Sequence, residues 1–143
     1  MRTKMMNKKL PRGLRNHNPL NIRKSATKWR GMSAVQADRS FVTFISNEWG
    51  YRAAFRILHT YITKYKLSTI RDIISRWAPP SENNTRMYTL TVVEHSGIDE
   101  RDKIYYTNKE DIVKIVMAMS YVENGVPAVK SEVENGYELA FGF

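Results

Sequence analysis

The segment TNKEDIVKIVMAMSYVENG, residues 107–125, decides the predicted fold. Nearly every residue from Ile112 to Val122 is apolar, and only Lys114 and Ser120 interrupt the run. A helix with this pattern has no polar face, so it should lie inside the domain with other elements packed around it. The sequence therefore predicts a central helix.

Flanking residues mark both ends of this helix. Thr107 followed three residues later by Glu110 predicts a capping box, in which each side chain satisfies a backbone N–H group of the other. Asn124 or Gly125 can adopt the left-handed conformation that ends a helix, and Pro127 prevents its continuation. The predicted helix therefore ends immediately after Glu123.

Glu123 is the unusual residue of this segment. A carboxylate in the last turn faces the negative end of the helix dipole, and burial also removes it from water. Both effects favour the protonated carboxylic acid, which is the form that a general acid needs. The alternative is that Glu123 points to solvent at a frayed helix end, because structural carboxylates outnumber catalytic ones.

Length and composition fit one domain with a substantial core. A chain of 143 residues buries roughly two-thirds of its unfolded surface. It contains no cysteine, and its three histidines, His17, His59 and His95, do not have metal-ligand spacing. We therefore expect no disulfide, metal site or cofactor. No apolar run approaches membrane-spanning length, and MRTKMMNKKL lacks the apolar segment of an ordinary signal peptide.

The net charge of +9 is concentrated near the N-terminus. Residues 1–30 contain ten Lys or Arg and no acid, so residues 31–143 together carry −1. Such a segment attracts polyanions, whether nucleic acid, acidic cell-wall polymers or membrane headgroups, and a solvated segment without a dedicated partner is an equal alternative. Residues 1–10 show no apolar periodicity, which predicts a disordered basic tail before a single domain over residues 11–143.

Caps and apolar spacing predict four further helices and few strands. The helices are one from Ser46 or Asn47 to about residue 65, one over TIRDIISRW (69–77) capped by Ser68 or Thr69, one opened by Ser81 and closed at Gly97, and one within residues 129–143. Residues 12–32 are rich in turn-forming residues and predict an ordered loop with a short hairpin at most, and FVTFI (41–45) is either a short strand or an extended segment. The predicted fold class is mainly α, or α+β with at most a small hairpin.

Five motifs carry a resemblance to a known family. RGLRNHNPLNIR (12–23), KWRGM (28–32), FVTFISNEWGYRAA (41–54), ISRWAPPSENNTRMY (74–88) and VENGVP (122–127) resemble, in the same order, a family of virion-associated or lysis-related proteins of phages and prophages. The chain departs from the family pattern at His17 and Leu20, where Asn and Gly are usual. Leu20 lacks the conformational freedom of glycine, so the backbone there is expected to differ.

This family is in turn similar in pieces to lysozyme-like enzymes, namely lytic transglycosylases and flagellar-type glucosaminidases. AMSYVENG (118–125) is similar to the helix that ends in their catalytic Glu, NPLNIR (18–23) with WRG (29–31) to their Asn-rich segment, and NTRMY (84–88) to a Thr-x-x-Tyr segment that lines the cleft. The resemblance implies a lysozyme-like single domain. Because the Glu-bearing helix comes last here, it also implies a circular permutation.

The resemblance also assigns expected roles to individual residues. Glu123 would be the general acid. Glu48 suits a base or electrostatic stabiliser at a helix start, where its ordinary role is to interact with the dipole. Tyr88 would hold an acetamido group of the substrate or Glu123, or else belong to the core. The candidate substrate-binding residues are Asn18, Asn21, Trp29, Trp77, Glu82, Asn83, Asn84 and Thr85, although asparagines commonly bond their own turns and tryptophans, including Trp49, commonly serve the core.

Two classes of function follow from these expectations. As an enzyme, the protein would cleave the β-1,4 links of peptidoglycan by hydrolysis or by transglycosylation, with one Glu sufficing where the substrate's acetamido group assists. As a virion structural or binding protein, it would use the same scaffold without turnover, and residues 1–30 would contact DNA, cell wall or virion proteins. In either case it would be made in the bacterial cytoplasm and act at the cell wall or in a virion. If Glu123 is the acid, it should face a cleft shared with residues 18–21 and Tyr88.

Overall fold

The computed structural model describes residues 10–142, which form six helices and no β-strand. The helices are α2 (Arg12–Arg15), α3 (Asn47–Thr63), α4 (Ile70–Trp77), α5 (Thr85–Ser96), α6 (Lys109–Asn124) and α7 (Lys130–Phe141). The mainly α fold class is therefore confirmed. The basic tail expected over residues 1–10 lies outside the described residues except for Leu10.

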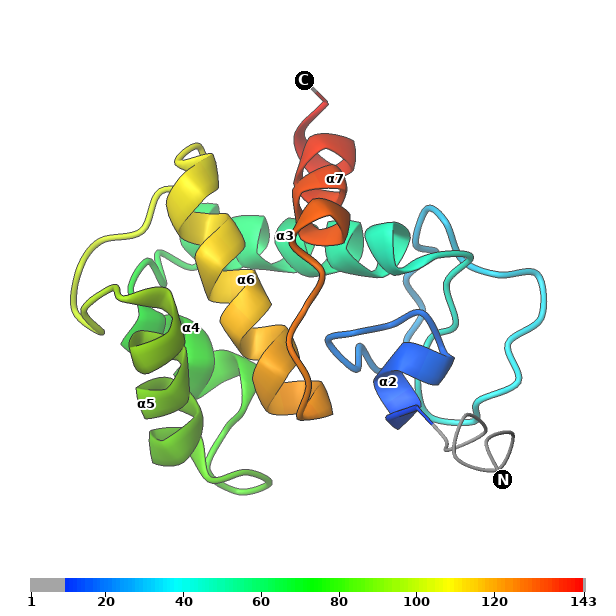
Figure 1. Cartoon of the computed structure of the whole chain (residues 1–143), viewed down its shortest axis with the longest axis horizontal. Helices are drawn as coiled ribbons and strands as arrows, with labels where there is room; N and C mark the ends of the chain where they lie inside the picture. The colour runs from blue at the N-terminus through cyan, green and yellow to red at the C-terminus, as the bar shows by residue number, and fades with distance from the viewer. Residues whose placement is uncertain (1–9, 143) are drawn as a thin grey trace, which may run out of the picture.

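Helix α6 occupies the centre, as its sequence predicts. It lies across the long helix α3, with α4 and α5 on one side and α2 with the N-terminal segment on the other (Figure 1), and it contacts α2, α3, α5 and α7. Lys114 remains exposed and Met117 and Tyr121 are half-buried, so one stripe of the helix is less covered than the apolar run suggests.

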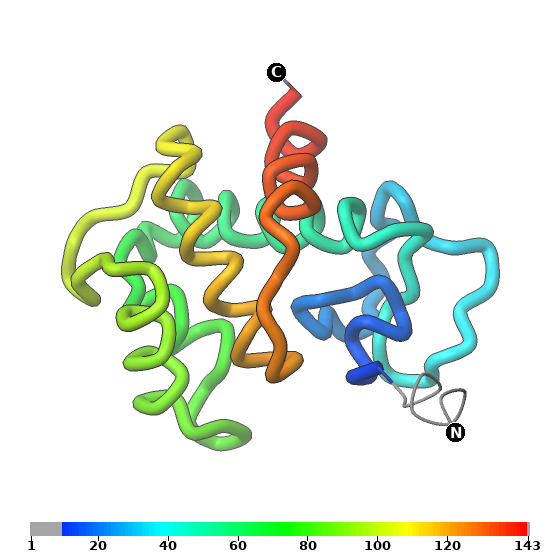
Figure 2. Tube along the Cα trace, viewed as in Figure 1, coloured from blue at the N-terminus to red at the C-terminus, as the bar shows by residue number. Residues whose placement is uncertain are grey.

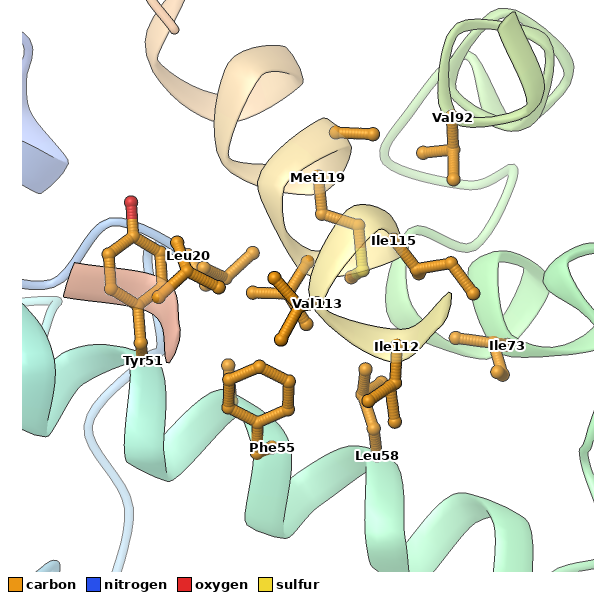
Figure 3. Close-up of a cluster of buried hydrophobic side chains, with 14 of the residues drawn as sticks. Leu20, Tyr51, Phe55, Leu58, Ile73, Val92, Ile112, Val113, Ile115 and Met119 are labelled. Atoms are coloured by element: carbon orange, nitrogen blue, oxygen red, sulfur yellow. The ribbon is translucent and has the colours of Figure 1, made fainter. Parts of the chain in front are cut away.

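The core fills the space between α6 and the helices around it. Leu58 of α3, Ile73 of α4 and Val92 of α5 point toward Ile112 and Ile115 of α6 (Figure 3), and all five are fully buried. Burying each such side chain contributes about 1.5–3 kcal/mol relative to leaving it in water. This packing fixes the direction of α6 and hence the place of its last turn.

Helix α7 lies close against α3 (Figure 2), and a glycine permits this approach. A Cβ atom on Gly136 would lie 2.6 Å from the Cβ atom of Tyr51 and 3.0 Å from the carbonyl oxygen of Glu48. Any larger residue would push the two helices apart. The α3–α7 contact therefore depends on glycine at this position.

Two predicted helix starts are wrong, one by a single residue and the other by three residues. The cap of α6 is Asn108 instead of Thr107, since the Asn108 side-chain oxygen accepts a hydrogen bond from the Asp111 backbone N–H at 3.1 Å, and the side chains of these two residues also bond each other. The cap of α5 is Asn84 instead of Ser81, because residues 79–83 form a turn in which the Glu82 backbone N–H bonds the Pro79 carbonyl oxygen.

Several other boundaries agree with the sequence. Thr69 caps α4 through a hydrogen bond from the Asp72 backbone N–H, and Ser46 precedes α3 without making a side-chain cap bond. Gly97 and Gly125 end α5 and α6 with φ of 73° and 72°. The last predicted helix is α7.

The N-terminal segment contains an ordered loop, and the short hairpin that the sequence allowed there does not form as a pair of strands. Two isolated antiparallel bridges, Arg23 with Phe41 and Met32 with Phe44, hold an irregular loop. Asp38 fixes this loop because its carboxylate accepts hydrogen bonds from the Arg12 guanidinium at 2.7 and 2.8 Å and from the Asn16 amide at 2.9 Å. The Arg12 bonds, and after them the Asn16 bond, hold the pKa of the Asp38 carboxyl well below its usual range.

Residues 11–16 also differ from the expectation of a loop, because α2 is a short helix. The backbone takes the left-handed conformation at His17 and Asn21, with φ of 51° and 53°. Leu20 does not share this conformation. Its side chain is 1% exposed and belongs to the core, which explains how leucine is accommodated where the family pattern has glycine.

Candidate active site

The last turn of α6 places the Glu123 carboxylate against three hydrogen-bond donors. The Asn21 side-chain amide donates to Oε1 at 2.8 Å. The Tyr88 hydroxyl donates to Oε2 at 2.9 Å, and the Trp77 indole N–H lies 3.4 Å from the same oxygen. These donors come from the N-terminal segment, the end of α4 and the start of α5, so Glu123 is the point where three separate parts of the chain meet.

Each donor has a local structural reason for its position. Asn21 follows the buried Leu20 and has φ of 53°, a conformation that asparagine tolerates better than most residues. Trp77 is the last residue of α4. Tyr88 lies one turn into α5, is 6% exposed, and is carried by a helix that begins at the Asn84 cap.

The pKa of Tyr88 is raised well above its ordinary value of 10. Burial of the hydroxyl is the main cause, and the nearby negative charge of Glu123 adds to it. Ionising Tyr88 would place a second negative charge beside the carboxylate without water to solvate it. Tyr88 therefore stays a neutral donor across the physiological pH range.

Glu123 opens onto a cleft of about 440 Å³. The cleft lies between residues 20–23 with Phe41 on one side and Trp77 with residues 79–83 on the other, and α3 contributes to its wall. Its lining combines aromatic rings with polar groups, and these residues are Leu20, Asn21, Ile22, Arg23, Phe41, Ile57, Tyr61, Trp77, Pro79, Glu82, Asn83 and Glu123. A cleft of mixed aromatic and amide character suits a ligand with apolar faces and hydrogen-bonding edges.

Glu123 thus faces a cleft that Asn21 also lines, and it contacts Tyr88, which does not itself line the cleft. No protein-family model matches the chain. The chain is 40% identical to protein P5 of Pseudoalteromonas phage PM2 over 134 residues, which cover 91% of this chain and 82% of that protein. The chain belongs to the family of this phage protein. The resemblance to phage proteins is therefore confirmed at the level of this P5 family.

Some of the other expected binding residues line the cleft of this P5-family chain, and the others support the structure around it. Trp77, Glu82 and Asn83 line the cleft. Asn84 caps α5, and the Thr85 hydroxyl donates to the Ala78 carbonyl oxygen at 2.5 Å. The last two therefore hold the turn that shapes the cleft instead of facing it.

Asn18 and Trp29 lie outside the cleft. Asn18 is 0% exposed, and its amide group bonds the Ile22 backbone and the Val42 carbonyl oxygen, so it has no donor free for a ligand. Trp29 packs against the core from the irregular loop. Both side chains stabilise the N-terminal segment.

Glu48 is the one expected catalytic residue that the structure separates from Glu123. It lies in the first turn of α3, where its carbonyl oxygen approaches α7 near Gly136, and it does not line the cleft. The position of Glu48 at a helix start could not predict this separation, because the helix dipole does not determine which face of α3 lines the cleft. Within residues 10–142, no group of three His, Cys, Asp or Glu residues could hold a metal ion.

Sequence reasoning missed Tyr61, Phe41 and Arg23. Tyr61 belongs to the apolar stripe of α3, and periodicity does not separate the part of that stripe that faces the core from the part that faces a cleft. Phe41 and Arg23 come from the irregular loop and stack, with the Arg23 guanidinium carbon 5.3 Å from the ring centre. A guanidinium nitrogen of Arg23 also lies 4.0 Å from a carboxylate oxygen of Glu82, across the cleft.

A tetrapeptide that occurs twice in the sequence provides an internal comparison for Glu123. The tetrapeptide Val-Glu-Asn-Gly occurs at residues 122–125 and again at 133–136. The second copy lies within α7, and its Glu134 lines a different cleft of about 910 Å³ between α5, α6 and α7. Only Glu123 meets Asn21, Trp77 and Tyr88.

Proposed function

We propose that this phage protein is a glycosidase that cleaves the β-1,4-linked glycan strands of peptidoglycan, with Glu123 as the general acid. The observation that carries the proposal is a single carboxylate at the end of a core helix, held by Asn21, Trp77 and Tyr88 on the wall of an aromatic-lined cleft. Glycosidic cleavage needs a positioned acid to protonate the leaving oxygen.

The three donors determine where the proton of the acid can go. The Asn21 amide and the Trp77 indole have only N–H groups to offer Glu123, so neither can accept a proton from it. The Tyr88 hydroxyl can donate or accept. With the Asn21 nitrogen facing Glu123, a protonated Glu123 can therefore donate only to Tyr88 or to a group in the cleft, where the glycosidic oxygen of a bound sugar would lie.

The cleft contains a second carboxylate only at its exposed edge. Glu82 lines the cleft, is exposed and lies near Arg23. Glycosidases without a second inner carboxylate can use the acetamido group of an N-acetylated sugar, which peptidoglycan supplies. This arrangement is compatible with a muramidase or glucosaminidase and with a lytic transglycosylase.

The proposal also includes the expected fold, the expected sugar-binding residues and the expected place of action. The domain would be lysozyme-like and circularly permuted, with the acid-bearing helix near the end of the chain. Trp77, Tyr61 and Phe41 would contact the apolar faces of sugar rings, and Asn83 their hydroxyl or acetamido groups. The protein would act at the cell wall or as part of a virion. No helix within residues 10–142 is long and apolar enough to cross a membrane.

A test is to incubate the purified protein with peptidoglycan sacculi and analyse the released fragments by mass spectrometry. Fragments with new reducing ends indicate hydrolysis, and fragments with anhydro ends indicate transglycosylation. Either product supports the proposal. The absence of any fragment from several wall preparations would contradict it.

One observation favours a second candidate function, that of a non-catalytic virion or binding protein. Both oxygens of Glu123 already accept hydrogen bonds from the protein, so the residue also ties three segments of the chain together. In that role the fold would be retained without turnover, and the basic residues 1–30 would contact DNA, cell wall or other virion proteins. Binding to sacculi without fragment release would support this second function.

A further inference from the structure

Two buried amide oxygens beside the proposed site have no hydrogen-bond partner. They are the Oδ1 atoms of Asn21 and Asn124. Folded proteins leave few buried polar atoms unpaired, because each costs free energy that a bond to water would have supplied. The surrounding structure must therefore hold both amides in this orientation.

The acceptors around the two amide nitrogens explain the orientation. Asn21 Nδ2 donates to the Glu123 carboxylate at 2.8 Å. Asn124 Nδ2 donates to the carbonyl oxygens of Pro19 at 2.8 Å and Ser120 at 2.9 Å. Rotating the Asn124 amide by half a turn would bring its oxygen against two carbonyl oxygens, and rotating the Asn21 amide would bring its oxygen against the ionised Glu123 carboxylate. Each nitrogen therefore keeps its bonds and each oxygen is left without one.

Gly13 of α2 accommodates both unpaired oxygens. A Cβ atom at this position would lie 2.7 Å from Asn21 Oδ1 and 2.8 Å from Asn124 Oδ1. Glycine leaves this space open, and its Cα hydrogens can make weak C–H···O contacts there. The two asparagines are thus packed against the same backbone atom.

Asn124 connects the end of α6 to the segment that presents Asn21. Its bond to the Pro19 carbonyl oxygen fixes the backbone two residues before Asn21. Its bond to the Ser120 carbonyl oxygen fixes the amide to α6, and the Ser120 hydroxyl lies 2.9 Å from the Tyr51 hydroxyl of α3. The amide of Asn124 therefore links the backbone just before Asn21 to the last turns of α6, which carry Glu123.

We propose that Asn124 is a positioning residue for Glu123, acting through the 19–21 backbone and the Asn21 amide. The proposal rests on the function proposed for Glu123, because positioning affects a reaction only if Glu123 takes part in it. Asn124 does not line the cleft, and its side chain bonds the Pro19 and Ser120 carbonyl oxygens and not the carboxylate. Its effect on turnover should accordingly pass entirely through Asn21.

The variant Asn124→Leu tests this role, since leucine has nearly the same shape, adds no charge and removes the N–H donor. The matched control is Asn135→Leu in the second Val-Glu-Asn-Gly, where the asparagine is exposed. Rates of fragment release are compared with the side-chain amide signal of Asn21 in ¹H–¹⁵N NMR spectra, assigned by its loss in Asn21→Ala. Asn124→Ala is the second variant in case leucine prevents folding.

We expect Asn124→Leu to lower the rate by on the order of tenfold to a hundredfold, because small displacements of a reacting group cost that much. The Asn21 signal should move in the direction seen in Glu123→Gln, and Asn135→Leu should change neither quantity. In the Asn21→Ala background, adding Asn124→Leu should cost no further rate. The positioning role would be overturned if the Asn21 signal did not move in Asn124→Leu. It would also be overturned if the rate losses of Asn124→Leu and Asn21→Ala multiplied in the double variant. An inactive wild-type protein would contradict the proposed function instead, and the NMR comparison would still decide the positioning role.

Discussion

At the residue scale, Glu123 combines an electrostatic environment with a specific set of partners. Its carboxylate lies in the last turn of α6, is half-buried, and accepts hydrogen bonds from three N–H or O–H donors. The donors decide the geometry, because they fix the direction in which the carboxylate faces the cleft.

Tyr88→Phe should weaken both stability and turnover. It removes the hydroxyl that donates to Glu123 at 2.9 Å but keeps the buried ring. Hydrogen bonds to charged groups contribute about 1.5–3 kcal/mol, so the free energy of unfolding should fall by about that amount in urea titrations. Unchanged stability together with an unchanged rate of fragment release would show that the Tyr88–Glu123 contact has neither role.

At the element scale, the sequence predicted most helices and misplaced two of their starts. Apolar spacing identified α3, a capping residue identified α4, a continuous apolar run identified α6, and the glycines after α5 and α6 marked their ends. The starts of α5 and α6 were wrong because Ser, Thr and Asn are all good caps, and only the tertiary position of the preceding loop decides which one is used. The conformation of the N-terminal loop was the most difficult to predict. Asp38 and two isolated bridges hold this loop through contacts between residues far apart in the sequence, which local patterns do not predict.

The cap of α6 can be tested directly. Asn108→Ala removes the side-chain oxygen that accepts from the Asp111 backbone N–H, and should lower the free energy of unfolding by about 1 kcal/mol. Thr107→Ala should change it by no more than about 0.5 kcal/mol, because surface substitutions away from such contacts have small effects. Thermal or urea unfolding measures both variants. A larger loss for Thr107→Ala would instead support the capping box predicted from the sequence.

The α3–α7 contact should respond to pH through His59. This side chain packs against Tyr106 and Phe141, with ring centres 4.5 and 5.9 Å away, and burial, with a further contribution from the positive charge of Arg56, lowers its pKa. A lowered pKa means that the unfolded chain binds the proton more readily. The stability that His59 contributes is therefore fully present above its unfolded pKa of about 6.5 and is lost as pH falls through the folded value.

Replacing the histidine isolates this effect. Unfolding of the wild type and His59→Phe should be compared at pH 7.5 and at pH 5. The wild type should lose more stability between these two conditions than the variant does. Equal losses would indicate that other groups account for the acid sensitivity.

At the scale of the whole molecule, the candidate site joins parts of the chain that lie far apart in the sequence. Asn21 and Glu123 are separated by 102 residues, and Tyr88 and Trp77 come from between them. Sequence patterns identified these residues one at a time through a resemblance. They could not show that Glu48 lies elsewhere or that Tyr61 and Phe41 line the cleft, because those facts depend on how helices cross. The sequence did single out Glu123, because its copy of Val-Glu-Asn-Gly ends an apolar helix and is followed by Val-Pro.

Charge is also uneven across the whole molecule. Residues 10–40 contain seven Lys or Arg and one acid. The variant Lys24→Gln/Lys28→Gln should elute from heparin at lower salt than the wild type, because affinity for polyanions depends on the local density of cations. Lys64→Gln/Lys66→Gln makes the same charge change outside this segment and should have a smaller effect. Equal shifts for the two variants would mean that net charge alone governs binding.

The most direct test of the central claim is the rate of peptidoglycan fragment release by Glu123→Gln. This change keeps the shape of the side chain and removes the transferable proton, and Glu134→Gln makes the same change in the second Val-Glu-Asn-Gly. We predict that Glu123→Gln loses activity by a factor of at least about 100, as expected for loss of a general acid, while Glu134→Gln keeps the wild-type rate. Wild-type activity in a folded Glu123→Gln protein would contradict the account.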